Sequence, residues 1–161
     1  MADVTPIKKL LVANRGEIAR RIMRTAHDMG ISTVAIFAEG DARAPFVNEA
    51  DTAIFLEGRT STETYLDVEK VINACKRSGA DAVHPGYGFL SENEGFAQAI
   101  IDAGIKWIGP SPQVIGLMGD KLSAKNLMTE AGVPTLPAIE ITDKLDVLKA
   151  ADEIGYPVLV K

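Results

Sequence analysis

Up to about residue 110, short apolar runs alternate with segments in which apolar residues recur at helical spacing. The runs predict five strands, at residues 10–13, 33–37, 52–56, 82–84 and 106–108. Between them, helices are expected from Gly16 to Gly30, from about residue 65 to 77, and after Ser91. The first helix carries four apolar residues on one face: Ile18, Ile22, Ala26 and Met29. Strands that alternate with helices predict an α/β fold with a doubly wound parallel sheet.

After the turn at 109–112 the pattern changes. Ser111 is expected to cap a short helix that begins at Pro112 and ends at Met118. Two further helices are predicted, one from about Lys121 to Ala131 and one capped by Thr142 with Leu145, Leu148, Ala151 and Ile154 on its apolar face. Residues 158–161 then form an apolar strand that needs neighbouring strands. We therefore expect a first domain at 1–118 and a second at 119–161, with the chain truncated inside the second.

Composition narrows the class of protein. The 161 residues carry a formal charge of -5, which argues against nucleic acid as a main partner because phosphate binding needs a basic face. Cys75 is the single cysteine and shares helical spacing with Val68, Val71 and Ile72, so we expect a small buried hydrophobe. No apolar stretch approaches the length of a membrane span or of a signal-peptide core. A cytoplasmic protein is expected, or an organellar one after removal of a leader.

The ten residues at 84–93 carry the clearest chemical signal. Pro85 favours an extended His84, while Gly86 and Gly88 allow positive φ and close approach of another group. Ser91, followed three residues later by a glutamate, predicts a capping box for a helix that carries Phe96, Ile100 and Ile101. Loops at the carboxyl ends of strands are where open α/β sheets hold ligands. From these residues alone, a turn that merely requires its glycines is an equal alternative.

Three further positions could meet phosphates. The segment 14–17 joins the first strand to the first helix, but with Gly16 alone it lacks the repeated glycines of a dinucleotide fingerprint. Arg15 and Glu17 could equally form a structural ion pair there. Lys121 at a helix start and Lys161 at a strand end could each neutralise phosphate charge. The alternative for both lysines is ordinary exposure to water.

The decapeptide at 84–93 resembles the signature of the biotin carboxylases. Further segments of the chain resemble other motifs of that family: residues 13–19, 108–111, 118–121, 131–134 and 155–161. The resemblance implies a Rossmann-like pre-ATP-grasp domain followed by the start of an ATP-grasp domain. It also implies an ATP-dependent ligase that activates bicarbonate as carboxyphosphate and then carboxylates biotin.

The resemblance also implies roles for individual residues. Lys121 and Lys161 would contact ATP phosphates, and Arg24 and Asp28 look like dimer contacts. Three residues would lie near biotin: His84, Tyr87 and Gly88. The Mg²⁺ ligands and the catalytic residues would follow Lys161, so we expect no metal or catalytic residue in this chain and no activity from it alone. The partners implied are a biotin carboxyl carrier, a carboxyltransferase and a second copy in a homodimer.

Two positions depart from the family pattern and two alternative functions stay open. Phe46 stands where the family often has histidine, and Ala138 where it often has glycine. Both departures bear on the subfamily more than on the activity. The alternatives are another ATP-grasp ligase that joins a carboxylate to an amine, and a non-catalytic assembly module that dimerises through the first helix.

Overall fold

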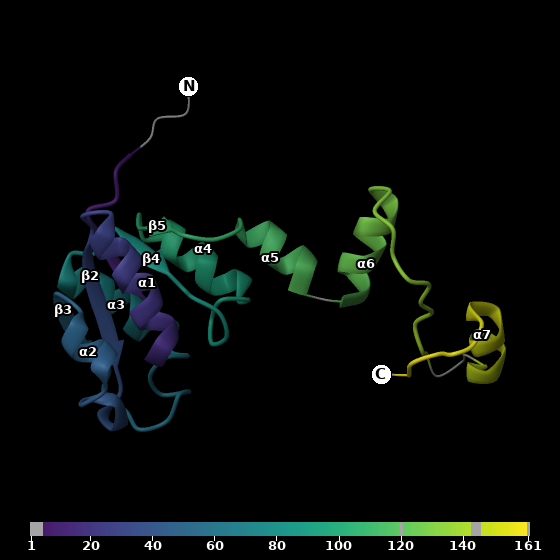
Figure 1. Cartoon of the computed structure of the whole chain (residues 1–161), viewed down its shortest axis with the longest axis horizontal. Coiled ribbons are helices and arrows are strands. Elements are labelled where there is room, and N and C mark those ends of the chain that lie inside the picture. The colour runs from purple at the N-terminus through teal and green to yellow at the C-terminus, as the bar shows by residue number, and fades with distance from the viewer. Residues whose placement is uncertain (1–4, 120, 143–145, 161) are drawn as a thin grey trace. The chain divides into compact units, whose positions relative to one another are not determined.

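The computed structural model describes residues 5–119, 121–142 and 146–160. The strands between residues 9 and 107 form a parallel sheet with the order β3-β2-β1-β4-β5 (Figure 1). The strands are β1 (Lys9–Val12), β2 (Ser32–Phe37), β3 (Thr52–Phe55), β4 (Ala82–His84) and β5 (Lys106–Trp107). All four strand pairs are parallel. The predicted fold class is confirmed.

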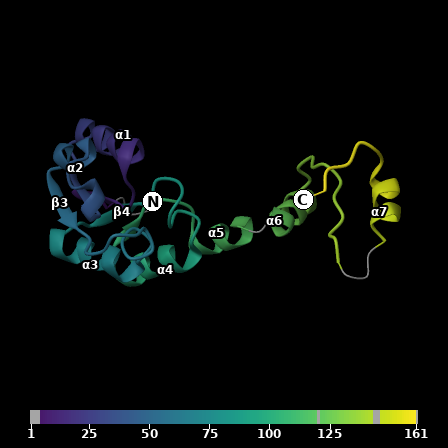
Figure 2. The ribbon, with the colours of Figure 1, turned by 90° about the horizontal axis from the view of Figure 1, so that it is seen from below.

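Helices cover both faces of the sheet, with α1 (Gly16–Asp28) and α2 (Pro45–Glu49) on one side and α3 (Val68–Ser78) and α4 (Glu94–Asp102) on the other (Figure 2). Side chains of a strand alternate between the two faces. Accordingly, Val12 packs with α1 and α2, whereas its neighbour Leu11 packs with α3 and α4. The sequence pattern did not predict α2 or the single turn η1 (Glu39–Asp41).

The stripe that α1 buries overlaps only in part with the predicted one, which included Ala26 and the partly buried Ile22. Ala19, Met23 and Ala26 are the buried residues of α1. Met29 was predicted on the apolar face, but α1 ends at Asp28 and Met29 is 69% exposed. The reason is that the chain reverses at Gly30, which has a left-handed φ of 73° and places Met29 at the end of the helix.

Two helices on the second face start later than the sequence predicted. The side chain of Asp67 caps α3 by accepting from the Lys70 N–H, so the helix begins at Val68 rather than near residue 65. Asn93 caps α4 by accepting from the Phe96 N–H at 2.8 Å, so the predicted capping box at Ser91 is wrong. In both cases an Asx side chain near the first turn satisfies the free N–H groups.

The chain divides into two compact units, Met1–Gly116 and Leu117–Lys161. The helices after the sheet are α5 (Pro112–Gly119), α6 (Lys121–Glu130) and α7 (Val147–Ile154). Asp146 caps α7, so the predicted cap at Thr142 is wrong, and the predicted Leu145 lies outside the described residues. Residues 158–160 are not in a strand, because the described part of the second unit has no strand with which they could pair.

The described part of the chain contains no helix that is both long and apolar enough to cross a membrane.

Candidate functional site

The site predicted from the sequence lies where the direction of winding reverses, between β1 and β4. These two strands are paired, and the Ala13 N–H donates to the His84 carbonyl oxygen at 2.9 Å. The loops that follow them therefore leave the same edge of the sheet side by side. This switch point is where open α/β sheets hold ligands.

Asn14 joins the two loops. Its Nδ2 donates to the Pro85 carbonyl at 2.8 Å and to the Tyr87 carbonyl at 2.9 Å, while its Oδ1 accepts from the Arg15 N–H at 2.9 Å. The side chain has no solvent exposure. Gly86 lies directly against it, since a Cβ on Gly86 would be 2.8 Å from Asn14 Nδ2. The amide thus replaces water for two carbonyls of the 84–93 loop.

The backbone of this loop is left-handed at three positions. Gly86 has φ of 68°, Gly88 has φ of 71° and Phe89 has φ of 44°. The two glycines take the positive φ that the sequence allowed, whereas Phe89 requires support because such a φ is strained for a bulky residue. That support comes from Tyr65, whose ring stacks on Phe89 with centroids 5.2 Å apart.

Tyr65 extends the support to the loops after β1 and β2. Its hydroxyl donates to Asp41 Oδ2 at 2.6 Å and accepts from the Ala38 N–H at 3.0 Å. Burial and the Asp41 hydrogen bond raise the pKa of Tyr65 well above its ordinary value. Asp41 also binds Arg15 Nη2 at 2.9 Å, so the alternative of an ion pair between Arg15 and Glu17 is wrong.

The side chains of His84 and Tyr87 point to different neighbours. His84 Nδ1 accepts from the Gly86 N–H at 3.0 Å, and burial lowers the pKa of the imidazole below its ordinary value of 6.5. The Tyr87 hydroxyl donates to Glu17 on α1, and this hydrogen bond raises the pKa of Tyr87. The Tyr87 side chain is otherwise open, with the residue 62% exposed.

Two of the three residues predicted near biotin line one cavity. The cavity has a volume of about 420 Å³, and His84, Gly86 and Tyr87 form part of its wall. The remaining lining is mostly apolar and comes from β1, α1 and the segments beside them: Ile7, Leu10, Ile18, Arg21, Ile22, Thr25, Ala26, Met29, Ile31 and Ile108. Gly88 is not part of this lining. The cavity suits an amphipathic ligand, with an apolar wall and a few polar groups.

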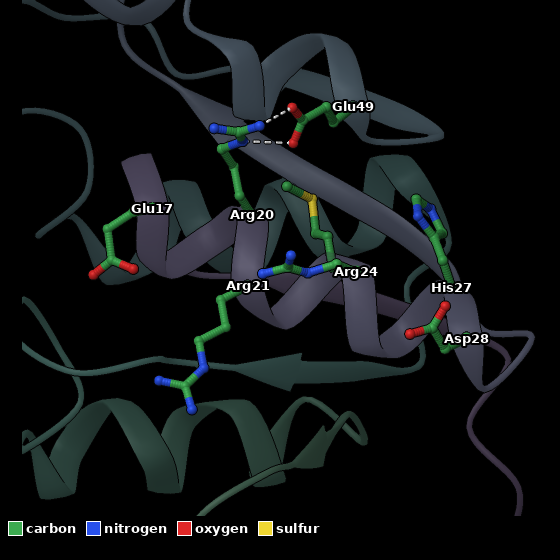
Figure 3. Close-up of a pocket in the computed structure, with 8 residues that line it drawn as sticks. Glu17, Arg20, Arg21, Arg24, His27, Asp28 and Glu49 are labelled. Carbon is green, nitrogen blue, oxygen red and sulfur yellow. Dashed lines mark hydrogen bonds and ion pairs between the residues drawn. The ribbon is translucent and has the colours of Figure 1, made fainter.

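A second cavity lies over the exposed side of α1 and contains both residues predicted as dimer contacts. Its volume is about 640 Å³, and it is lined by Arg24, Asp28 and six further residues: Glu17, Arg20, Arg21, Met23, His27 and Glu49 (Figure 3). Arg20 forms a bidentate pair with Glu49, at 2.6 and 2.7 Å. Within the described residues, no ion pair within 4.0 Å engages Arg24 or Asp28.

The side chains of both predicted phosphate-binding lysines lie outside the described part of the structure. Lys121 is the first residue of α6, but its side chain lies outside the described part of the structure, as does all of Lys161. In the described ranges, no group of three or more His, Cys, Asp or Glu side chains could hold a metal ion. The described residues therefore supply no cluster of ligands for Mg²⁺.

Sequence reasoning missed Asn14 as a contact of the loop, and it missed Asp41 and Tyr65 as supports. The one available signal was a polar amide directly after an apolar strand, at a position where the fold buries the chain. The fold and the loop together define an α/β domain whose switch point carries a loop of the kind that binds ligands.

Comparison with known proteins identifies the family. The profile described as "Biotin carboxylase, N-terminal domain" matches residues 6–115, and the one described as "Carbamoyl-phosphate synthase L chain, ATP binding domain" matches residues 120–161. The first match covers more than half of the chain. The chain belongs to the biotin carboxylase N-terminal domain family.

Curated relatives agree with this assignment. The biotin-dependent acyl-coenzyme A carboxylase alpha3 subunit of Mycobacterium leprae is 50% identical over 96% of this chain and 26% of its own length. The biotin carboxylase of Halalkalibacterium halodurans is 46% identical over 96% of this chain and 34% of its own length. The chain thus spans about a quarter to a third of these relatives.

Solved structures agree as well. The biotin carboxylase domain of a thermophilic 2-oxoglutarate carboxylase bound to bicarbonate has a TM-score of 0.87 and 48% identity, over 96% of this chain and 35% of that chain. The corresponding domain dimer from Hydrogenobacter thermophilus, in complex with MgADP, ADP and bicarbonate, has a TM-score of 0.85 and 48% identity. The match covers 96% of this chain and 34% of that chain. These matches do not favour the two alternative functions.

Proposed function

We propose that this chain supplies the biotin-facing loop and the start of the ATP site of a biotin carboxylase. In that reaction bicarbonate attacks the γ-phosphorus of ATP, which releases ADP and forms carboxyphosphate. A ureido nitrogen of biotin then takes the carboxyl group, and phosphate leaves. The observation that carries the proposal is the 84–93 loop at the β1–β4 switch point, in a chain 48% identical to a bicarbonate-bound biotin carboxylase domain.

Within this proposal, Tyr87 and His84 lie near the biotin ring and Gly88 completes the turn between them and the helix. The support is the shared cavity, whose apolar wall suits the hydrocarbon part of biotin and whose polar groups suit the ureido end. The neutral His84 imidazole donates through Nε2, since its Nδ1 already accepts from Gly86. Because burial favours the neutral imidazole, its single N–H, at Nε2, is available to donate to a carbonyl oxygen of the ligand.

Lys121 and Lys161 would neutralise ATP phosphates, as family motifs at 118–121 and 155–161 suggest. ATP, bicarbonate and carrier-bound biotin are the substrates of the proposed reaction, and ATP acts with Mg²⁺. The metal ligands are expected from residues outside this chain, and no step is assigned to them. We divide the chain at residues 118 and 119 into a pre-ATP-grasp domain and the beginning of the ATP-grasp domain.

A chimera tests the proposal. Residues 10–161 replace the matching segment of the Hydrogenobacter thermophilus 2-oxoglutarate carboxylase small subunit, which is 48% identical to this chain. We expect bicarbonate-dependent ATP cleavage that free biotin accelerates. MgADP binding by calorimetry serves as the folding control, and Lys121→Ala and Lys161→Ala should each weaken it about tenfold or more. A folded chimera whose ATP cleavage is insensitive to biotin would refute the proposal and favour a carboxylate–amine ligase.

The partners we propose are a biotin carboxyl carrier, a carboxyltransferase and, for the dimer, a second copy of the chain. The exposed side of α1 supports the last of these. It carries both signs of charge, and Arg24 and Asp28 have no ion-pair partner within the described residues. An isologous interface brings the same patch of both copies together, so Arg24 of one copy can meet Asp28 of the other.

Charge reversal tests this interface in the same chimera. Arg24→Glu should shift sedimentation toward the monomer, and Arg24→Glu combined with Asp28→Arg should restore the dimer. Lys76→Glu on the exposed side of α3 is the matched control and should leave the dimer intact. Equal dissociation by the control, or no rescue by the double variant, would place the interface elsewhere. We propose a cytoplasmic location for the assembly, consistent with the single buried cysteine.

A further inference from the structure

Among the largest fully buried side chains of the described residues, Asn14 is the one that carries an amide. We propose that Asn14 is a positioning residue for the biotin end of the site, acting through the backbone of residues 85–87. This inference rests on the proposed biotin carboxylase function. It adds a residue that touches none of the three substrates and determines where Tyr87 and His84 lie.

The hydrogen-bond geometry accounts for every polar group of the Asn14 amide. The two hydrogens of Nδ2 go to the carbonyls of Pro85 and Tyr87, and Oδ1 receives the Arg15 N–H. Aspartate would have the same shape but no hydrogen to donate, so it would direct a carboxylate oxygen at two carbonyl oxygens. An amide of this length is therefore required at position 14.

The loop depends on this amide because little else holds Tyr87. Its ring is exposed, and its single side-chain hydrogen bond is the one to Glu17. The backbone carbonyl of Tyr87, by contrast, is fixed directly by Asn14. Gly86 fills the space between them, with no room for a Cβ against Asn14 or Ile18.

The same contact reaches His84. The Gly86 N–H donates to His84 Nδ1, and this bond selects the tautomer that carries its proton on Nε2. If the 85–87 backbone shifts, the donor to Nδ1 shifts with it. Loss of the Asn14 amide should therefore displace His84 and Tyr87 in the cavity wall, while the segments of the second unit proposed to bind phosphate are unchanged in sequence.

The test uses Asn14→Asp in the chimera, with Thr33→Val as the matched control. Thr33 is also fully buried and hydrogen-bonded, but it lies at the start of β2, at the opposite edge of the sheet. We expect Asn14→Asp to raise the KM for biotin about tenfold or more. Bicarbonate-dependent ATP cleavage without biotin should change less than about twofold, because that half-reaction does not use the loop. Thr33→Val should leave both unchanged.

Hydrogen exchange on the 161-residue chain gives a readout that does not require activity. The amides of Gly86 and Ser91 are hydrogen-bonded within the loop, at 3.0 Å each. Their exchange should accelerate about tenfold in Asn14→Asp and stay unchanged in Thr33→Val. This measurement also serves if the substituted chimera does not assemble.

The outcomes separate the two proposals. Equal effects of both substitutions on the biotin KM would overturn the positioning role and leave Asn14 a structural residue. Unchanged loop exchange in Asn14→Asp would overturn it as well. If the unsubstituted chimera shows no biotin stimulation while loop exchange responds as expected, the proposed function fails and the control of the loop by Asn14 stands.

Discussion

Replacing each of the two glycines of the decapeptide by alanine separates backbone strain from steric clash. Gly86 and Gly88 have nearly the same left-handed φ, 68° and 71°. An alanine in this region costs about 1–2 kcal/mol whatever surrounds it. A Cβ at Gly88 meets nothing within 4 Å, whereas at Gly86 it would lie 2.7 Å from Ile18 Cγ2 and 2.8 Å from Asn14 Nδ2.

The expected losses differ for this reason. Gly88→Ala should lower the free energy of unfolding by about 1–2 kcal/mol, from backbone strain alone. Gly86→Ala adds the cost of forcing atoms into a packed site, about 1–3 kcal/mol, for a total of about 2–5 kcal/mol. Both partners of the clash resist movement, because Asn14 is tied to two carbonyls and Ile18 lies on the first turns of α1.

Urea unfolding of the 161-residue chain measures both losses. Trp107 is the single tryptophan, and its indole packs edge-on against Phe96 in the first unit, so its fluorescence reports on the unit that contains the loop. The informative quantity is the difference between the two variants, which isolates the clash. Equal losses for Gly86→Ala and Gly88→Ala would show that Asn14 and Ile18 yield freely, and would refute the close packing on which the positioning argument depends.

Three further predictions follow from the charged and nucleophilic groups. Burial raises the pKa of the Cys75 thiol to about 12, so thiol reagents at about pH 8 should modify the native chain far more slowly than the urea-unfolded chain; similar rates would contradict its burial. The Thr33 N–H donates to Asp51 at 2.7 Å and, as the largest contribution, holds the pKa of this carboxyl below 3.8. Its stabilisation is present above the unfolded-state pKa of about 4 and is lost as pH falls through the lower folded-state value, so Asp51→Asn should flatten the acid side of the stability curve; an unchanged slope would argue against this linkage. Glu17→Ala should lower the pKa of Tyr87 toward 10.0, measured by tyrosinate absorbance with Tyr87→Phe identifying the transition. An unmoved midpoint would rule out the hydrogen bond to Glu17 as the cause of the raised pKa.

The sheet was predictable because burial on both faces leaves a continuous apolar signal. All five strands were located from short apolar runs, and the burial of Cys75 followed from helical spacing. Helix starts were harder to predict from the sequence, and before α4 two residues that could cap the helix lie close together. Ser91 and Asn93 both suit an N-cap, and the structure uses Asn93 because turns continue past Ser91, with the Asn93 N–H bonded to the Leu90 carbonyl.

The second unit shows where local pattern is insufficient. The apolar residues at 158–160 have the composition of a buried strand, yet Leu159 is 80% exposed and Val160 is 64% exposed. A strand is defined by its partners, and the described residues of this unit offer none. The predicted strand is therefore wrong for residues 158–160, because an apolar run forms a strand only where other strands can pair with it.

The site likewise combines features that depend on single residues with contacts between residues far apart in the sequence. Glycine takes a positive φ readily whatever surrounds it, so the sequence alone indicates that Gly86 and Gly88 can adopt one. The contact of Asn14 with the carbonyls of Pro85 and Tyr87 spans more than seventy positions and exists only because β1 pairs with β4. A polar amide that follows an apolar strand at a switch point must find partners when it is buried. Searching for such residues beside the adjacent strand's loop would have identified Asn14, and it offers a physical route to positioning residues that no local motif reveals.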